Sequence, residues 1–141
     1  MASAVQAAAG SIYSHLSSNI TSIASGWTAA TNVAWPGVDY EPASEWVRPE
    51  IVWGDADLES MTSSGRNTLN GVLILTLFDR AGSGYGTLNG YADNCRDLFD
   101  RASPGSSVEF LAASGPRQVN IDDTRWLQVS ISIPFLVEEQ S

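Results

Sequence analysis

Residues 70–78, Asn-Gly-Val-Leu-Ile-Leu-Thr-Leu-Phe, are the stretch that decides the fold. Side chains alternate between the two faces of a β-strand, and in this run both alternating sets are apolar. That pattern is typical of a central strand that is covered on both sides. A domain this small has one layer of helices, which covers one face. A neighbouring subunit is therefore a natural cover for the second face.

An amphipathic helix is predicted directly after this strand. Its apolar positions recur at spacings of three and four: Leu88, Tyr91, Ala92, Cys95, Leu98 and Phe99. Two further strands are predicted, over 107–113 and 125–137, and the second alternates cleanly, with Ser130 and Ser132 among its outward residues. The polar connection between them leaves room for a short strand over 118–121. The tail, 137–141, is short and charged and is predicted to be frayed.

On the N-terminal side, an amphipathic helix is predicted over 2–25, ended by Gly26. A loop follows, with one short strand over 32–35, and the aromatic rings of Trp35 and Tyr40 are expected to pin it to the body. The next strand, 46–53, contains Pro49, which lacks a backbone donor and so favours an edge position or a bulge. The polar, acidic segment 54–67 is predicted to be a long hairpin loop, functional or mobile.

This order of elements predicts an α+β fold, a mainly antiparallel β-sheet with two α-helices packed on one face. The length of 141 residues is the usual size of one domain, so 1–141 is expected to form a single domain.

Charge excludes several classes of partner. The chain has sixteen acidic residues and seven arginines, no lysine, and a net charge of −9. Scattered arginines do not form the clustered basic patch that nucleic-acid binding needs, and an acidic surface disfavours anionic membranes. The first residues do not resemble a signal peptide, and no apolar run approaches the roughly 18 residues of a membrane span, so a cytosolic protein is expected.

Candidate chemical groups are few, and none forms a catalytic, cofactor or metal site. The glycine turn Gly82–Gly86 lies between a predicted strand and a helix, where phosphate-binding loops occur. A dinucleotide fingerprint needs glycine at the position of Thr87, and a P-loop needs a lysine, which this chain lacks. His15 has no catalytic or metal-binding partner in the sequence and is expected to be a partly exposed surface residue. Cys95, the only cysteine, is expected to be a small buried hydrophobe. We therefore predict that the protein is not an enzyme.

The acidic cluster Asp55-x-Asp57-x-Glu59 has the spacing of a calcium loop. An EF-hand requires glycine at its sixth position and glutamate at its twelfth, where this chain has Ser60 and Arg66. The cluster is better explained as a solvated loop or as a surface that faces a partner.

Several features occur in a definite order along most of the chain. An N-terminal helix precedes Ala34-Trp35-Pro36-Gly37, Tyr40-Glu41-Pro42 and the strand that opens with Trp46-Val47-Arg48. The apolar strand 71–78, the glycine turn, a helix with Tyr91-Ala92-Asp93 and the final strand 126–135 follow. In this order and length, the chain resembles the tail terminator proteins of long-tailed bacteriophages (siphophages), typified by the lambda minor tail protein U.

The resemblance implies a virion structural protein that forms a homohexameric ring on the last ring of the tail tube. Such a ring ends tube polymerisation and presents the surface that joins the head-tail connector or neck protein, and DNA passes through its lumen without specific binding. The resemblance also implies assembly in the host cytoplasm and a final place at the neck-proximal end of the tail. The predicted loop and its flanks are the candidate oligomer or tube interface: Trp53, Asp55, Asp57, Leu58, Glu59, Met61 and Arg66.

Two other functions remain open on the sequence. A head-tail connector or neck adaptor has the same size and fold class as a tail terminator and also forms rings. A small-molecule or nucleotide-binding module could use the turn Gly82–Gly86.

Overall fold

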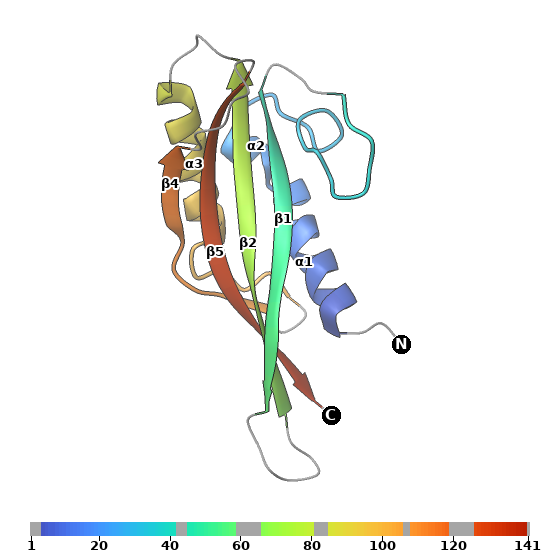
Figure 1. The fold of residues 1–141 in the computed structure, drawn as a ribbon. Coiled ribbons are helices and arrows are strands. Elements are labelled where there is room, and N and C mark those ends of the chain that lie inside the picture. The colour runs from blue at the N-terminus through green and yellow to red at the C-terminus, as the bar shows by residue number, and fades with distance from the viewer. Residues whose placement is uncertain are drawn as a thin grey trace.

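Three long antiparallel strands form the middle of the structure (Figure 1). The computed structural model describes residues 4–41, 45–58, 66–80, 85–105, 108–118 and 126–140. Its elements run along the chain in this order: α1 (Ala4–Ser18), α2 (Ile20–Ile23), β1 (Glu45–Leu58), β2 (Arg66–Arg80), α3 (Gly86–Phe99), β3 (Val108–Phe110), β4 (Ser114–Gln118) and β5 (Trp126–Gln140).

The sheet has five strands in the order β1-β2-β5-β3, with β4 also paired to β5, and all strand pairs are antiparallel. β2 pairs with β5 along its whole length, from Arg66 opposite Gln140 to Arg80 opposite Trp126. The apolar stretch 70–78 is therefore central, as its pattern predicts. β1 lies at one edge, so Pro49 is on an edge strand, which confirms that prediction.

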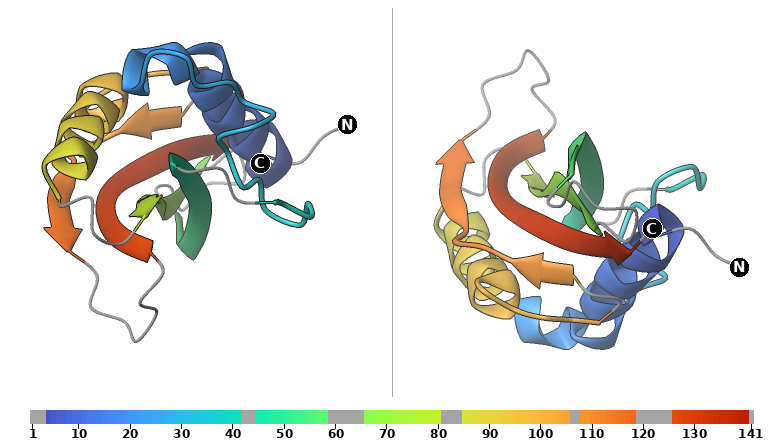
Figure 2. Two further views of the ribbon diagram at one scale, coloured as in Figure 1. Left: turned by 90° about the horizontal axis from the view of Figure 1, so that it is seen from above. Right: turned by 90° about the horizontal axis from the view of Figure 1, so that it is seen from below.

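The helices lie on one side of the sheet when the molecule is viewed along the strands (Figure 2). α3 contacts β2 and β5, and α1 contacts β3 and β5. The sheet residues beneath them are fully buried and form one core with the apolar faces of the helices: Leu73, Leu75, Leu77, Val129, Ile131, Ile133 and Phe135 from the sheet, and Ile12, Leu16, Leu88, Cys95 and Phe99 from the helices. The predicted α+β class is confirmed.

The first helix differs from its prediction because it is broken at Asn19. The backbone of Asn19 leaves the helical region, with φ −117° and ψ 21°, and α2 begins at Ile20. The Asn19 side chain donates a hydrogen bond to the carbonyl of His15 (2.9 Å). Asparagine side chains compete in this way with the backbone bonds of a helix. The described part of the chain thus has three helices instead of the two predicted.

The predicted strand over 32–35 is a single parallel bridge between Val33 and Val47. The predicted strand over 107–113 is shortened to β3, and β4 occupies 114–118, earlier than the predicted 118–121. Gly115 allows β4 to pair with β5 at this position. Its φ is +110°, and a Cβ atom there would lie 2.9 Å from the Ser130 carbonyl oxygen, so a larger residue would not fit.

At the other end of the sheet, the strands are longer than predicted. Residues 54–58 and 66–67, expected in a loop, belong to β1 and β2, with Leu58 opposite Asn67 and a bulge between Trp53 and Ala56. The expected frayed tail is strand as far as Gln140, paired with the start of β2. Strands pair through backbone N–H and C=O groups, and every residue except proline has both. Polar residues can therefore extend a strand, although their side-chain pattern predicts a loop. We call residues 54–58, 66–69 and 137–140 the strand extension; it runs past the helices at the bottom of Figure 1.

Candidate interaction surface

The sheet has a second face, which points away from the helices. Because strand side chains alternate, this outer face carries the even-numbered residues of the three long strands: Trp46, Arg48, Glu50 and Val52 of β1; Asn70, Val72, Ile74, Thr76 and Phe78 of β2; and Gln128, Ser130, Ser132, Pro134 and Leu136 of β5. Its two halves differ in how they are covered.

The half that contains Phe78 is closed by the chain's own aromatic rings. Trp46 stacks on Phe78 with 3.8 Å between centroids, and Trp126 and Tyr40 contact Trp46 at 5.8 and 5.1 Å. The guanidinium of Arg48 lies 5.3 Å from the Phe78 ring centroid, a cation–π contact. Both Trp46 and Phe78 are buried. A neighbouring subunit was the natural candidate for this cover, but over this half of the strand the chain's own aromatic rings supply it.

Tyr40 reaches Trp46 because the loop before β1 is fixed against the body. Trp35 donates its indole N–H to the carbonyl of Ala29 (3.0 Å), and Tyr40 donates its hydroxyl to the carbonyl of Thr31 (2.6 Å). The Trp35 ring also meets Tyr13 edge-on at 5.6 Å. The prediction that Trp35 and Tyr40 pin this loop is confirmed.

The other half of the outer face is open and apolar. Val52 lies opposite Val72, Val72 lies opposite Pro134, and the N–H of Leu111 donates to the Pro134 carbonyl (2.8 Å). These four residues form one row across the sheet, which we call the apolar row. Val52 is 50% exposed and Leu111 is 40% exposed. With Leu136, the row lines a groove of about 290 Å³, the apolar groove.

A polar hollow lies beside the apolar groove, nearer the start of β5. It has a volume of about 250 Å³ and is lined by Ser114, Gly115, Arg117, Ser130 and Ser132. We call it the serine pocket. Ser132 and Pro134 are successive outer-face positions of β5, so the two hollows adjoin. Among the described residues that line the two hollows, Arg117 is the only ionisable one, and it is exposed.

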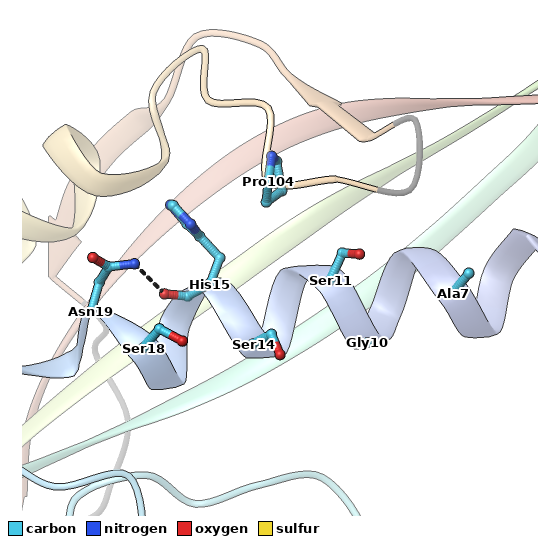
Figure 3. Close-up of a pocket in the computed structure, with 8 residues that line it drawn as sticks. All are labelled: Ala7, Gly10, Ser11, Ser14, His15, Ser18, Asn19 and Pro104. Carbon is cyan, nitrogen blue, oxygen red and sulfur yellow. Dashed lines mark hydrogen bonds between the residues drawn. The ribbon is translucent and has the colours of Figure 1, made fainter.

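A third hollow, of about 550 Å³, lies along α1 (Figure 3). Small residues such as Ser11 and Ser14 line it, together with Pro104 and His15. Nε2 of His15 donates to the carbonyl of Leu98 (3.0 Å), and its ring meets Phe99 edge-on at 5.1 Å. His15 therefore ties α1 to α3. It is partly exposed, as predicted.

Cys95 is fully buried in the core, as predicted, and burial raises the pKa of its thiol to about 12. Only the thiolate reacts with disulfide reagents, so the folded protein should resist them. We expect the aromatic disulfide reagent DTNB to label Cys95 at pH 8 only as fast as the protein unfolds. In concentrated urea, labelling should be complete within minutes. Rapid labelling without denaturant would show that the thiol is accessible.

The described residues hold no group of three or more His, Cys, Asp or Glu side chains that could bind a metal ion. No helix within the described ranges is long and apolar enough to cross a membrane. Of the glycine turn, only Tyr85 and Gly86 are described, and α3 begins at Gly86.

The structure does not gather the seven predicted interface residues into one described site. Trp53 is half-buried and meets Phe135 edge-on at 5.2 Å, although it also lines the apolar groove. The backbones of Asp55, Asp57, Leu58 and Arg66 lie in the strand extension, and Glu59 and Met61 lie outside the described residues.

Sequence reasoning missed the apolar row and the serine pocket. One signal for them was present, because the outward set of the last strand continues from Ser130 and Ser132 into Pro134 and Leu136.

Comparisons with known proteins identify relatives. A family model described as phage tail terminator protein matches residues 12–135. No curated protein matches. One solved chain without a descriptive name has 19% identity and a TM-score of 0.64, covering 91% of this chain and 94% of that one.

A second solved chain comes from the virion of a native gene transfer agent particle. It has 16% identity and a TM-score of 0.55, and the match covers 90% of this chain and 91% of that one. At these identities, both solved chains show that the fold is shared. The family match covers most of the chain, so this protein belongs to the phage tail terminator family and is a structural component of the virion tail, not an enzyme.

Proposed function

We propose that the protein caps the tail tube as a hexameric ring, ends tube polymerisation and forms the surface that joins the head. The family supports the capping role. The apolar row is the observation that supports self-association into a ring, because a contiguous apolar patch exposed on a protein surface marks an interaction site. Such a ring would assemble in the host cytoplasm and remain in the virion at the neck-proximal end of the tail.

Charge supports the passage of DNA through such a ring. Each subunit carries −9, so a hexamer would carry about −54, a potential that repels a polyanion and keeps it from adhering to the bore. The ring would therefore let DNA pass without binding it specifically.

The strand extension is the proposed contact with the tail tube. It projects past the helices, and β1 has only one strand neighbour in the described sheet, so its outer edge presents unpaired backbone groups to a partner. The candidate contact residues remain the seven predicted from the sequence: Trp53, Asp55, Asp57, Leu58, Glu59, Met61 and Arg66.

Tube assembly in vitro tests the proposal directly. The tail tube protein of the same phage would be polymerised with and without this protein, and tube lengths would be measured on negatively stained micrographs. We expect a ring-shaped cap at one tube end and no further growth from that end when more tube protein is added. A matched amount of serum albumin is the control. Continued growth, or binding to the head connector but not to tubes, would contradict the proposal.

A further inference from the structure

We infer that the apolar groove and the serine pocket receive residues 36–41 of a second copy of this chain. Val38 of that copy fills the apolar groove, and its acidic neighbours Asp39 and Glu41 approach Arg117. We call residues 36–41 the Val38 turn. The inference rests on the self-association in the proposed function and names the two surfaces that meet.

The apolar groove has the size and lining of a side-chain socket. Its volume of about 290 Å³ is at the lower limit of small-molecule pockets, which span about 300–1,000 Å³. Val52 and Leu111, at the two ends of the apolar row, are among the three large hydrophobic side chains that are exposed in the described structure. Covering them removes apolar surface from water, which favours association.

Val38 is the third of these side chains and the most exposed, at 61%. Its N–H donates to the carbonyl of Trp35 (3.2 Å), which closes a turn, and Gly37 supplies a φ of +75°. The bonds of Trp35 and Tyr40 to the body hold the base of the turn. A projecting side chain on a fixed turn loses little conformational entropy when it binds.

The charges of the two surfaces are complementary. The Val38 turn contains two exposed acidic residues, Asp39 and Glu41, and no basic residue. The described linings of the two hollows contain one charge, that of Arg117. An apolar side chain beside a carboxylate therefore matches an apolar groove beside a pocket with an arginine and three serine hydroxyls. This local match lets two acidic subunits approach one another.

A subunit cannot fill its own groove with its own turn. Tyr40 of the turn lies on Trp46, whereas the groove begins at Val52, six residues along β1, or about 20 Å. In Figure 1 the loop that contains the turn stands beside the upper part of β1. Two different complementary surfaces on one chain produce head-to-tail contacts, which close into a ring when the rotation permits.

Sedimentation velocity of the purified protein tests this inference with two single variants. Val38→Asp places a charge in the groove, and Arg117→Glu places like charges opposite the turn. Each should weaken self-association at least about tenfold. Both residues are exposed, so the circular dichroism and the melting temperature should stay those of the wild type. Arg101→Glu, the same charge change at an exposed residue outside both hollows, is the control and should leave association unchanged.

Two combinations show whether the surfaces touch. Adding Asp39→Arg and Glu41→Arg to Arg117→Glu should recover much of the lost association. A mixture of the Val38→Asp and Arg117→Glu proteins should form a two-subunit complex and no ring, because only one intact turn can meet one intact groove.

Rings formed by both single variants as readily as by the wild type would overturn the inference while leaving the capping proposal intact. A wild type that neither self-associates nor caps tubes would instead refute the proposed function.

Discussion

Replacing Phe135 by alanine is expected to destabilise the fold by about 3–5 kcal/mol, the usual result of removing a buried aromatic ring. Phe135 is 1% exposed, and its ring meets Trp53 at 5.2 Å and Phe110 at 5.7 Å, both edge-on. Phe110 in turn meets Phe99 of α3 at 5.2 Å. The ring therefore links β1, β3 and α3 across the core. Small domains have about 5–15 kcal/mol of stability in total, so this loss is a large part of it.

Equilibrium unfolding in urea would measure the effect as a lower midpoint. Phe135→Leu is the matched control, because leucine keeps most of the buried volume and should cost clearly less than alanine. If leucine lowered the midpoint as much as alanine, loss of the aromatic contacts, and not loss of buried volume, would account for the effect. A midpoint unchanged by alanine would mean that Phe135 is not in the core.

The second large effect is expected at Gly71, where alanine should cost about 1–3 kcal/mol through overpacking. A Cβ atom there would lie 2.7 Å from Cζ of Phe135 and 2.9 Å from the carbonyl oxygen of Val52. The Val52 carbonyl belongs to the backbone of β1 and cannot swing aside. Thermal and urea unfolding would measure the loss.

Gly90→Ala is the control for Gly71→Ala. Gly90 is exposed inside α3, and a Cβ atom there meets nothing within 4 Å. Alanine should stabilise that helix by about 0.5–1 kcal/mol, so the two glycines should respond with opposite signs. Adding Phe135→Leu to Gly71→Ala should cost less than the sum of the two single changes, because the shorter side chain makes room. Strict additivity would show that the ring and Gly71 do not compete for space.

The parts of the fold with a strong apolar period could be predicted from the sequence. The stretch 70–78 identified the centre of β2, and the three-and-four spacing from Leu88 to Phe99 identified α3. Burial of Cys95 followed from the same spacing. Each of these predictions depends on side chains that meet the core.

The features that sequence missed depend on backbone pairing or on contacts between distant segments. A hydrogen bond from the Asn19 side chain to His15 breaks the first helix without interrupting its apolar stripe. The strand extension is paired through the backbone, so its acidic residues resemble a loop. The apolar row joins Val52 and Leu111, which are far apart in sequence, and only the strand order brings them to one face.

The place of β5 in the sheet also determines when the subunit can become functional during its synthesis. β5 is translated after every other strand, yet it lies between β2 and β3 and supplies one wall of both outer-face hollows. At about 5–20 residues per second, the ribosome needs several seconds to reach β5 after it has finished β2. During that time the nascent chain lacks β5 and therefore has neither the apolar groove nor the serine pocket. A chain that has not been translated through β5 therefore lacks the surface inferred to bind a second copy, so a subunit could take a place in the ring only after β5 has been made.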